Sequence, residues 1–221
     1  MSPLKSLVLC AVLMGLTACY PLSTKYPLGQ QRMDPALEGT WTDDDGTALT
    51  FIKQDRKRLR AILSSDDEDD IRAHYLVRPS RIDGKTYMSI TAVFPKESIE
   101  AYAASEEISY REAKKALQGR DRRLNGYYLG YYTITKDEND DGGKVDRLQI
   151  YLLDSESKIV AADIEAGKLS GGMVEAKTEE GASEEILYLT SSSKKLTSYV
   201  ASHGESPDVL FDFDIVDMVR K

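Results

Sequence analysis

The residues with metal-binding spacing lie in one acidic stretch in the second half of the chain. Asp137, Asn139 and Asp141 carry side-chain oxygens at alternate positions and are followed by a glycine, as in the first half of a calcium-binding loop. The second half of such a loop is missing, because its twelfth position is Leu148, where a bidentate glutamate is needed. A calcium site would therefore need Asp146 or a distant carboxylate, and the pattern favours an acidic turn between two strands.

The side chains needed for catalysis are few. The two histidines are His74, inside an expected strand, and His203, in the last turn of an expected helix, where the helix dipole favours an imidazole. There is no Gly-x-Ser-x-Gly motif, phosphate-binding loop or dinucleotide motif, and zinc would need more His or Cys ligands. Acidic residues cluster at 43–45, 66–70 and 137–141, so a hydrolase that uses carboxylates remains an alternative function. Because these clusters read as solvated turns, a noncatalytic protein without a cofactor is favoured.

Cys19 carries the most specific chemical signal. It follows an apolar run at 7–16, which has the length of a signal-peptide core and is too short to span a bilayer. The sequence Leu16-Thr17-Ala18-Cys19 resembles the lipobox of bacterial lipoproteins, which implies attachment of diacylglycerol to the thiol and cleavage before Cys19. Cys10 would leave with the signal peptide, so acylation also accounts for an unpaired thiol in an oxidising compartment. The alternative is an ordinary secretory signal with a cysteine at its cleavage site.

The residues after Cys19 bear on location. In enteric-type bacteria the resemblance implies that aspartate at position 20 favours retention in the inner membrane; this chain has Tyr20, so the expected location is the outer membrane, facing the periplasm. Residues 20–35 contain three prolines, which favours an extended tether. We therefore expect a signal peptide at 1–18, a lipidated tether at 19–35 and a single domain at 36–221.

Composition excludes one class of partner. The chain is 41% hydrophobic and 8% aromatic, which is ordinary for a globular protein with a substantial core. Removing residues 1–18 takes away one charged residue, Lys5, and leaves 28 basic and 37 acidic residues. Such a surface repels nucleic acid and anionic lipid, so the expected contacts are the bilayer through the acyl anchor and a partner protein or small ligand.

Strand-like runs dominate the first half of the folded part. They are rich in branched and aromatic residues and lie at 48–53, 58–63, 71–78 and 86–94, with a hairpin-type Asp83-Gly84 between the last two. Their spacing predicts a meander that curls toward a barrel or sandwich. The segment Pro95–Gln118, rich in Glu, Ala and Lys and followed by Gly119, predicts one or two inserted helices.

A tyrosine-rich strand follows at 126–135. Its glycines allow bending or close approach, Tyr127 and Tyr131 share one face, and Tyr128 and Tyr132 share the other. The tyrosines are interpreted as packing residues, with an aromatic ligand groove as the alternative.

The last third contains one internal similarity. Ile150–Gly167 and Leu187–Gly204 align without gaps, and each predicts a strand, a serine cap, a helix and a glycine stop. The alternation in Val209–Val219 predicts a half-buried closing strand.

The start of the folded part carries a second resemblance. Gly39-Thr40-Trp41 is similar to the Gly-x-Trp motif that opens lipocalins, in which the tryptophan closes the barrel bottom and a basic side chain near the end of the barrel packs over it; Arg220 is the candidate here. The later Thr-Asp-Tyr motif of that family is not visible, and Trp41 as a plain core residue remains the alternative. The expected fold is β-rich α+β: a partly lipocalin-like antiparallel barrel or curled sheet with an inserted helical segment and two late helices, or else an open antiparallel sheet packed by helices.

The expected function follows from the anchor and from the lack of a visible catalytic set. We expect a noncatalytic, membrane-anchored envelope lipoprotein that binds a partner protein or a small ligand. A hydrolase that uses carboxylates and a structural component of envelope assembly are the alternatives.

Overall fold

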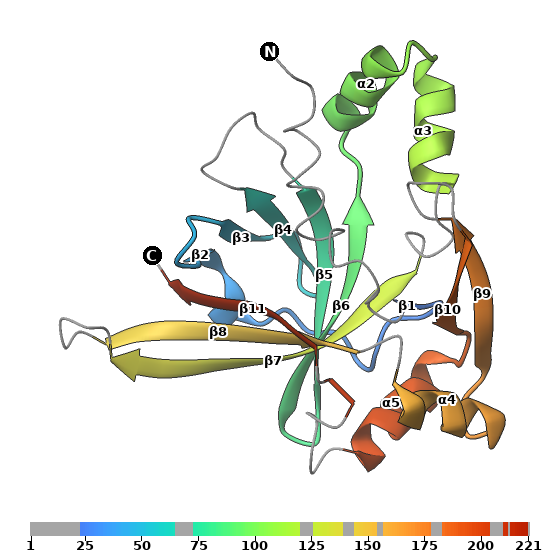
Figure 1. Ribbon diagram of the computed structural model, residues 1–221. Coiled ribbons are helices and arrows are strands. Elements are labelled where there is room, and N and C mark those ends of the chain that lie inside the picture. The colour runs from blue at the N-terminus through green and yellow to red at the C-terminus, as the bar shows by residue number, and fades with distance from the viewer. Residues whose placement is uncertain are drawn as a thin grey trace.

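The protein is a β-rich α+β fold built on a closed eight-stranded antiparallel barrel. The computed structural model describes residues 23–64, 73–119, 126–138, 144–153, 157–177, 183–203, 210–211 and 213–220 (Figure 1). The predicted fold class is confirmed. The predicted signal peptide, Cys19, Asn139 and Asp141 lie outside the described residues.

The barrel strands form a ring in the order β6-β5-β4-β3-β2-β11-β8-β7. Their bounds are Gly39–Thr42 (β2), Ala48–Lys53 (β3), Leu59–Ser64 (β4), Ala73–Ile82 (β5), Lys85–Val93 (β6), Tyr127–Glu138 (β7), Lys144–Leu152 (β8) and Phe213–Arg220 (β11). The predicted meander is β2 to β6. The ring closes where β6 pairs with β7, from Thr86 opposite Tyr132 to Ile90 opposite Tyr128, so the alternative of an open sheet is wrong.

The hairpin between β5 and β6 turns as its sequence predicts. Asp83 and Gly84 have φ values of 48° and 82°, the left-handed conformation that a two-residue turn of this kind needs. The turn fixes the register from Ile82 opposite Lys85 onward, and with it the residues of β5 and β6 that face the barrel interior.

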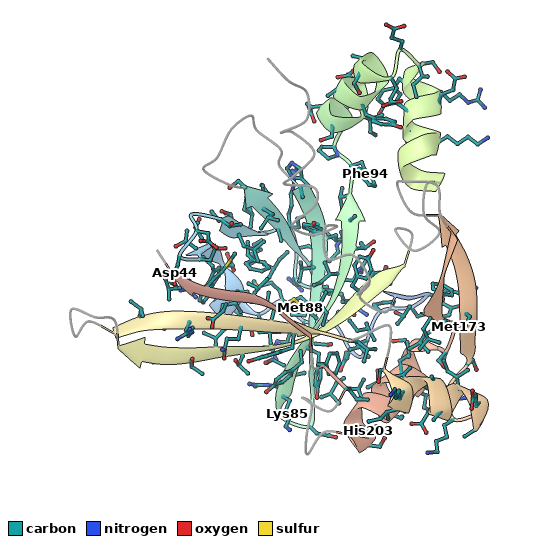
Figure 2. The ribbon with its side chains drawn as sticks, viewed as in Figure 1. Asp44, Lys85, Met88, Phe94, Met173 and His203 are labelled. Atoms are coloured by element: carbon teal, nitrogen blue, oxygen red, sulfur yellow. The ribbon has the colours of Figure 1, made fainter. Side chains whose placement is uncertain are left out.

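Alternate residues of the barrel strands face inward and pack into one hydrophobic cluster. Met88, labelled in Figure 2, is completely buried in it. The buried members are Leu37, Trp41, Leu49, Phe51, Leu59, Ala61, Val77, Met88, Tyr132, Leu148, Ile150, Leu152 and Met218. Side chains therefore occupy the interior of the barrel.

Strand β7 joins the barrel to a three-stranded extension of the same hydrogen-bonded sheet, here called the second sheet. Beyond Gly130, where its pairing with β8 ends, the same edge pairs with β1 (Ser23–Thr24), which pairs in parallel with β10 (Ser183–Leu189); β10 in turn pairs with β9 (Gly171–Lys177). A Cβ atom at Gly130 would lie 3.2 Å from side-chain atoms of Leu152 and Met88, so the predicted close approach at this glycine is confirmed.

Two helices cover the second sheet, α4 (Lys158–Glu165) and α5 (Ser193–Ser202). Ser157 and Ser192 cap them by accepting hydrogen bonds from Val160 N and Lys195 N, which confirms the predicted strand–cap–helix order in both similar segments. Gly167 ends the first segment at φ 72°, as expected of a glycine stop, whereas Gly204 lies outside the described residues.

The predicted helical insert is a hairpin of α2 (Lys96–Ser105) and α3 (Tyr110–Gly119). Ser109 and Glu112 form a capping box: Glu112 accepts from Ser109 N at 3.0 Å, and Ser109 accepts from Glu112 N at 3.3 Å. The two helices enclose a small cluster of their own around Ile99, Ala103 and Ala113. In Figure 1 the hairpin projects from the barrel.

The segment expected to be a free tether is largely part of the fold. Besides β1, the backbone N–H of Lys25 donates to Leu189 O, and a 3-10 helix (η1) spans Pro35–Leu37. Leu28 is completely buried, and its N–H donates to Ser89 Oγ at 2.8 Å. The described fold therefore already includes Ser23 and does not begin at residue 36, because strand pairing and burial tie this segment to the sheet.

Candidate functional site

The barrel end that holds Trp41 is closed by side chains from both ends of the folded chain. Trp41 is fully buried, its Nε1–H donates to Leu37 O at 2.9 Å, and the Arg220 guanidinium lies 4.3 Å from the ring centroid. Arg220 also donates to Glu38 O at 2.6 Å and to Ala36 O. The predicted packing of Arg220 over Trp41 is confirmed. A cation over an aromatic face stabilises the closure, and the arginine satisfies carbonyls at the end of the 3-10 helix.

A tyrosine fixes the same helix from inside the barrel. The hydroxyl of Tyr132, on β7, donates to Asp34 Oδ2 at 2.7 Å, while Asp34 Oδ1 accepts from Ala36 N and caps the 3-10 helix. Burial, reinforced by the Asp34 carboxylate, raises the pKa of the Tyr132 phenol, so it stays protonated as the donor. This end of the barrel is therefore a structural closure.

The tyrosines of β7 divide between the barrel cluster and a second hydrophobic cluster, as their alternation predicts. This second cluster, here called the second core, includes Tyr87, Leu189, Leu196, Val200 and Phe211. Tyr132 faces the barrel interior, whereas Tyr131 faces the second core, with its ring 5.5 Å from Tyr87 and 6.4 Å from Phe211 between centroids. Burial, with a further contribution from Tyr131, raises the pKa of Tyr87 to about 12. These rings are packing residues, which favours the packing interpretation over an aromatic groove.

A polar cluster joins the two late helices, and the sequence did not predict it. Asp163 on α4 is buried and accepts from Lys168 Nζ at 2.7 Å and from the Tyr199 hydroxyl, on α5, at 2.9 Å. Lys168 first, then the Tyr199 hydroxyl, hold the pKa of the Asp163 carboxyl below its ordinary value. Both carboxylate oxygens have partners, so the cluster fastens α4 to α5.

His74 lies in its predicted strand, and His203 lies one residue beyond its predicted helix, at the C-cap of α5. His203, labelled in Figure 2, follows the last residue of α5; its Nδ1 is 2.9 Å from Tyr199 O, and its ring lies 4.5 Å from the Tyr199 ring between centroids. His74 lies on β5, and its Nδ1 accepts from Arg60 Nη2 at 2.9 Å. His74 and His203 lie on different elements and belong to no common cluster of described side chains that could bind a metal.

The structure describes the backbone of only one of the three candidate calcium ligands. Asp137 is the last residue but one of β7, and the other two candidate ligands lie outside the described residues. Asp146, the carboxylate expected to complete a site, lies on β8 with Oδ2 3.1 Å from Arg220 Nε. The described part of the chain holds no group of three or more possible metal-ligating side chains. Calcium binding at Asp137, Asn139 and Asp141 stays a prediction.

A shallow hollow of about 470 Å³ lies where the N-terminal segment crosses α5. Gly29 N donates to Thr197 Oγ1 at 2.8 Å, which fixes the segment against the helix. The lining residues are Gly29, Gln30, Ser193, Lys194, Thr197 and Ser198. The hollow is open to solvent, so it has the character of a contact surface more than that of an enclosed ligand pocket.

The Asp163 cluster gives a prediction for acid stability. Because the pKa is lowered in the folded state, the stabilisation by Asp163 is present above its ordinary pKa of 3.8 and is lost as pH falls from there through the lowered value. Asp163→Asn should lower the free energy of unfolding by about 1–2 kcal/mol near pH 6. On acidification, the free energy of unfolding of this variant should fall by less than that of wild type. Urea titrations between pH 6 and pH 3 measure both effects. The matched control is Asp44→Asn on an exposed turn, whose free energy of unfolding should change with pH as in wild type. If the free energy of unfolding of Asp163→Asn falls with pH as steeply as that of wild type, Asp163 does not contribute to acid stability in this way.

No family model, curated protein or solved structure matches this chain. The barrel and its tryptophan–arginine closure are therefore established by geometry, and no relative supplies a ligand or an activity. Among the described helices none is long and apolar enough to cross a membrane.

Proposed function

We propose that this chain is a noncatalytic, lipid-anchored envelope protein whose barrel domain binds a partner protein. The anchor is the predicted diacylglycerol on Cys19, and the proposed location is the outer membrane, facing the periplasm. The observation that favours a partner protein over an internal ligand is the packed barrel interior, in which Trp41, Met88 and Tyr132 are buried among their neighbours. A small apolar ligand would have to displace these side chains.

The hairpin of α2 and α3 is the surface proposed for the partner. Barrel closure does not require it, because β6 and β7 pair directly and a short turn would join them. Ordering such a segment costs about 1–2 kcal/mol per residue in backbone entropy. Among the side chains that the structure describes, the hairpin's own cluster has three buried residues. An insert that adds little to the barrel and projects from it is suited to contact with another protein.

Site-specific photo-crosslinking tests this surface. A photoreactive residue in place of Tyr110, which is 40% exposed on α3, should give a discrete adduct with one envelope protein in intact cells. The matched control is Ile52 on β3, an apolar residue with 48% exposure on the barrel wall, which should give none. Adducts of equal yield at both positions, or none at Tyr110, would contradict the proposed surface.

A further inference from the structure

The first strand places the start of the folded chain at a fixed point in the structure. Ser23 lies opposite Tyr128 of β7 and Tyr188 of β10, and Thr24 lies opposite Tyr127 and Leu189. Thr24 is completely buried, and the next residue donates its N–H to Leu189 O. The backbone at Ser23 is therefore held between two strands and cannot extend toward a distant bilayer.

The distance from this point to the proposed anchor is short. Only residues 20–22 separate Cys19 from Ser23. Four residue steps of extended chain reach at most about 14 Å. A free tether over the whole of 20–35 would have reached roughly 50 Å. If the acyl chains of Cys19 lie in the hydrocarbon region, Ser23 is held at or just above the lipid headgroups.

The residues that follow β1 have the character of a membrane interface. Tyr26 is 40% exposed, and Lys25 Nζ lies 5.4 Å from the centroid of its ring. Tyrosine and lysine place apolar atoms near the acyl boundary and a polar tip among the headgroups. The chain then passes along the first turns of α5, where Gln30 and Lys194 line the open hollow. Figure 1 shows β1 beside β10, on the side of the molecule that carries α4 and α5.

We propose that the exposed side chains of residues 25–30 and of the first turns of α5, here called the membrane face, rest on the headgroups of the bilayer that holds Cys19. The proposal depends on the proposed lipid anchor. The short link of residues 20–22 sets the distance between Ser23 and the bilayer. The exposed side chains of Lys25, Tyr26 and Lys194 provide the headgroup contacts. The opposite wall of the barrel, around β3, points away from the lipid, because β3 is four strands from β7 in the ring of eight.

Single introduced cysteines can measure this orientation. Cys10 would leave with the signal peptide and Cys19 would be acylated, so a new cysteine would be the only free thiol of the mature lipoprotein. Tyr26→Cys and Gln30→Cys report on the membrane face, and Ile52→Cys, exposed on β3, is the matched control. Each lipidated variant is labelled with an environment-sensitive fluorophore and reconstituted in phosphatidylcholine vesicles, which carry no net charge.

A lipid with a nitroxide on its headgroup serves as the quencher. Quenching at positions 26 and 30 is expected to exceed quenching at position 52 at least threefold. Equal quenching at all three positions, with Cys19 shown by mass spectrometry to be acylated, would overturn the membrane face and leave the anchor intact. Absence of the acyl group would overturn the anchor and the membrane face together.

Discussion

Trp41→Ala is expected to lower the free energy of unfolding by about 4 kcal/mol, since truncation of a buried tryptophan typically costs about 3–5 kcal/mol. Trp41 is fully buried in the barrel cluster, so alanine would leave a cavity lined by its former neighbours. The change also removes the ring beneath the Arg220 guanidinium and leaves Leu37 O without its indole donor. Both losses act on the same closure, so the 3-10 helix should loosen together with the barrel end.

Urea unfolding of the mature chain, produced without the signal peptide and followed by far-ultraviolet circular dichroism, measures this effect. Tryptophan fluorescence is unsuitable because Trp41 is the only tryptophan. Ile52→Ala is the control, since truncation of this exposed side chain should change stability by less than about 0.5 kcal/mol. A loss below about 1 kcal/mol for Trp41→Ala would mean that the closure contributes little to the fold.

Removal of the Cys19 thiol is expected to move essentially all of the protein from the membrane fraction to the soluble fraction. Each buried methylene contributes about 0.8 kcal/mol, so two long acyl chains together contribute well over 10 kcal/mol, whereas a single myristoyl chain binds only marginally.

The variant must be exported by another route, because the lipobox resemblance implies that acylation precedes cleavage. Residues 1–18 are therefore replaced by an ordinary cleavable secretory signal, and Cys19→Ser is compared with the native chain by fractionation of the envelope. Mass spectrometry of the native N-terminal peptide should show the diacylglycerol group. A native chain that stays soluble and carries no lipid would refute the anchor.

The sequence predicted the parts of the fold that depend on local pattern and residue type. Alternating strands, the Asp83-Gly84 turn, the serine caps and the packing of Arg220 over Trp41 were all predicted, because each rests on a few neighbouring residues or on a distinctive pair. Strand β1 was not, since two residues carry no periodicity and Tyr188, the partner of Ser23, lies far along the sequence. Strand β9 begins with Gly171-Gly172, which are poor strand formers, and was missed for that reason.

The closing strand and the Asp163 cluster show the same limit. Leu210 and Phe211, expected in the last strand, lie before β11 and are buried in the second core, which alternation alone could not distinguish from the barrel interior. Asp163 meets Tyr199 across 36 positions of sequence, and that contact exists only because α4 and α5 pack side by side. Such contacts depend on the packing of elements, which no local window contains.

The pairing of β1 also sets an order of events for a newly made chain. Ser23 is among the first residues of the folded part to leave the ribosome, yet its partner Tyr188 and the closing strand Phe213–Arg220 are made near the end. Neither sheet can be completed until almost the whole chain has been synthesised. An exported chain of this topology could complete neither the barrel nor the second sheet while its last strands were still inside a secretion channel.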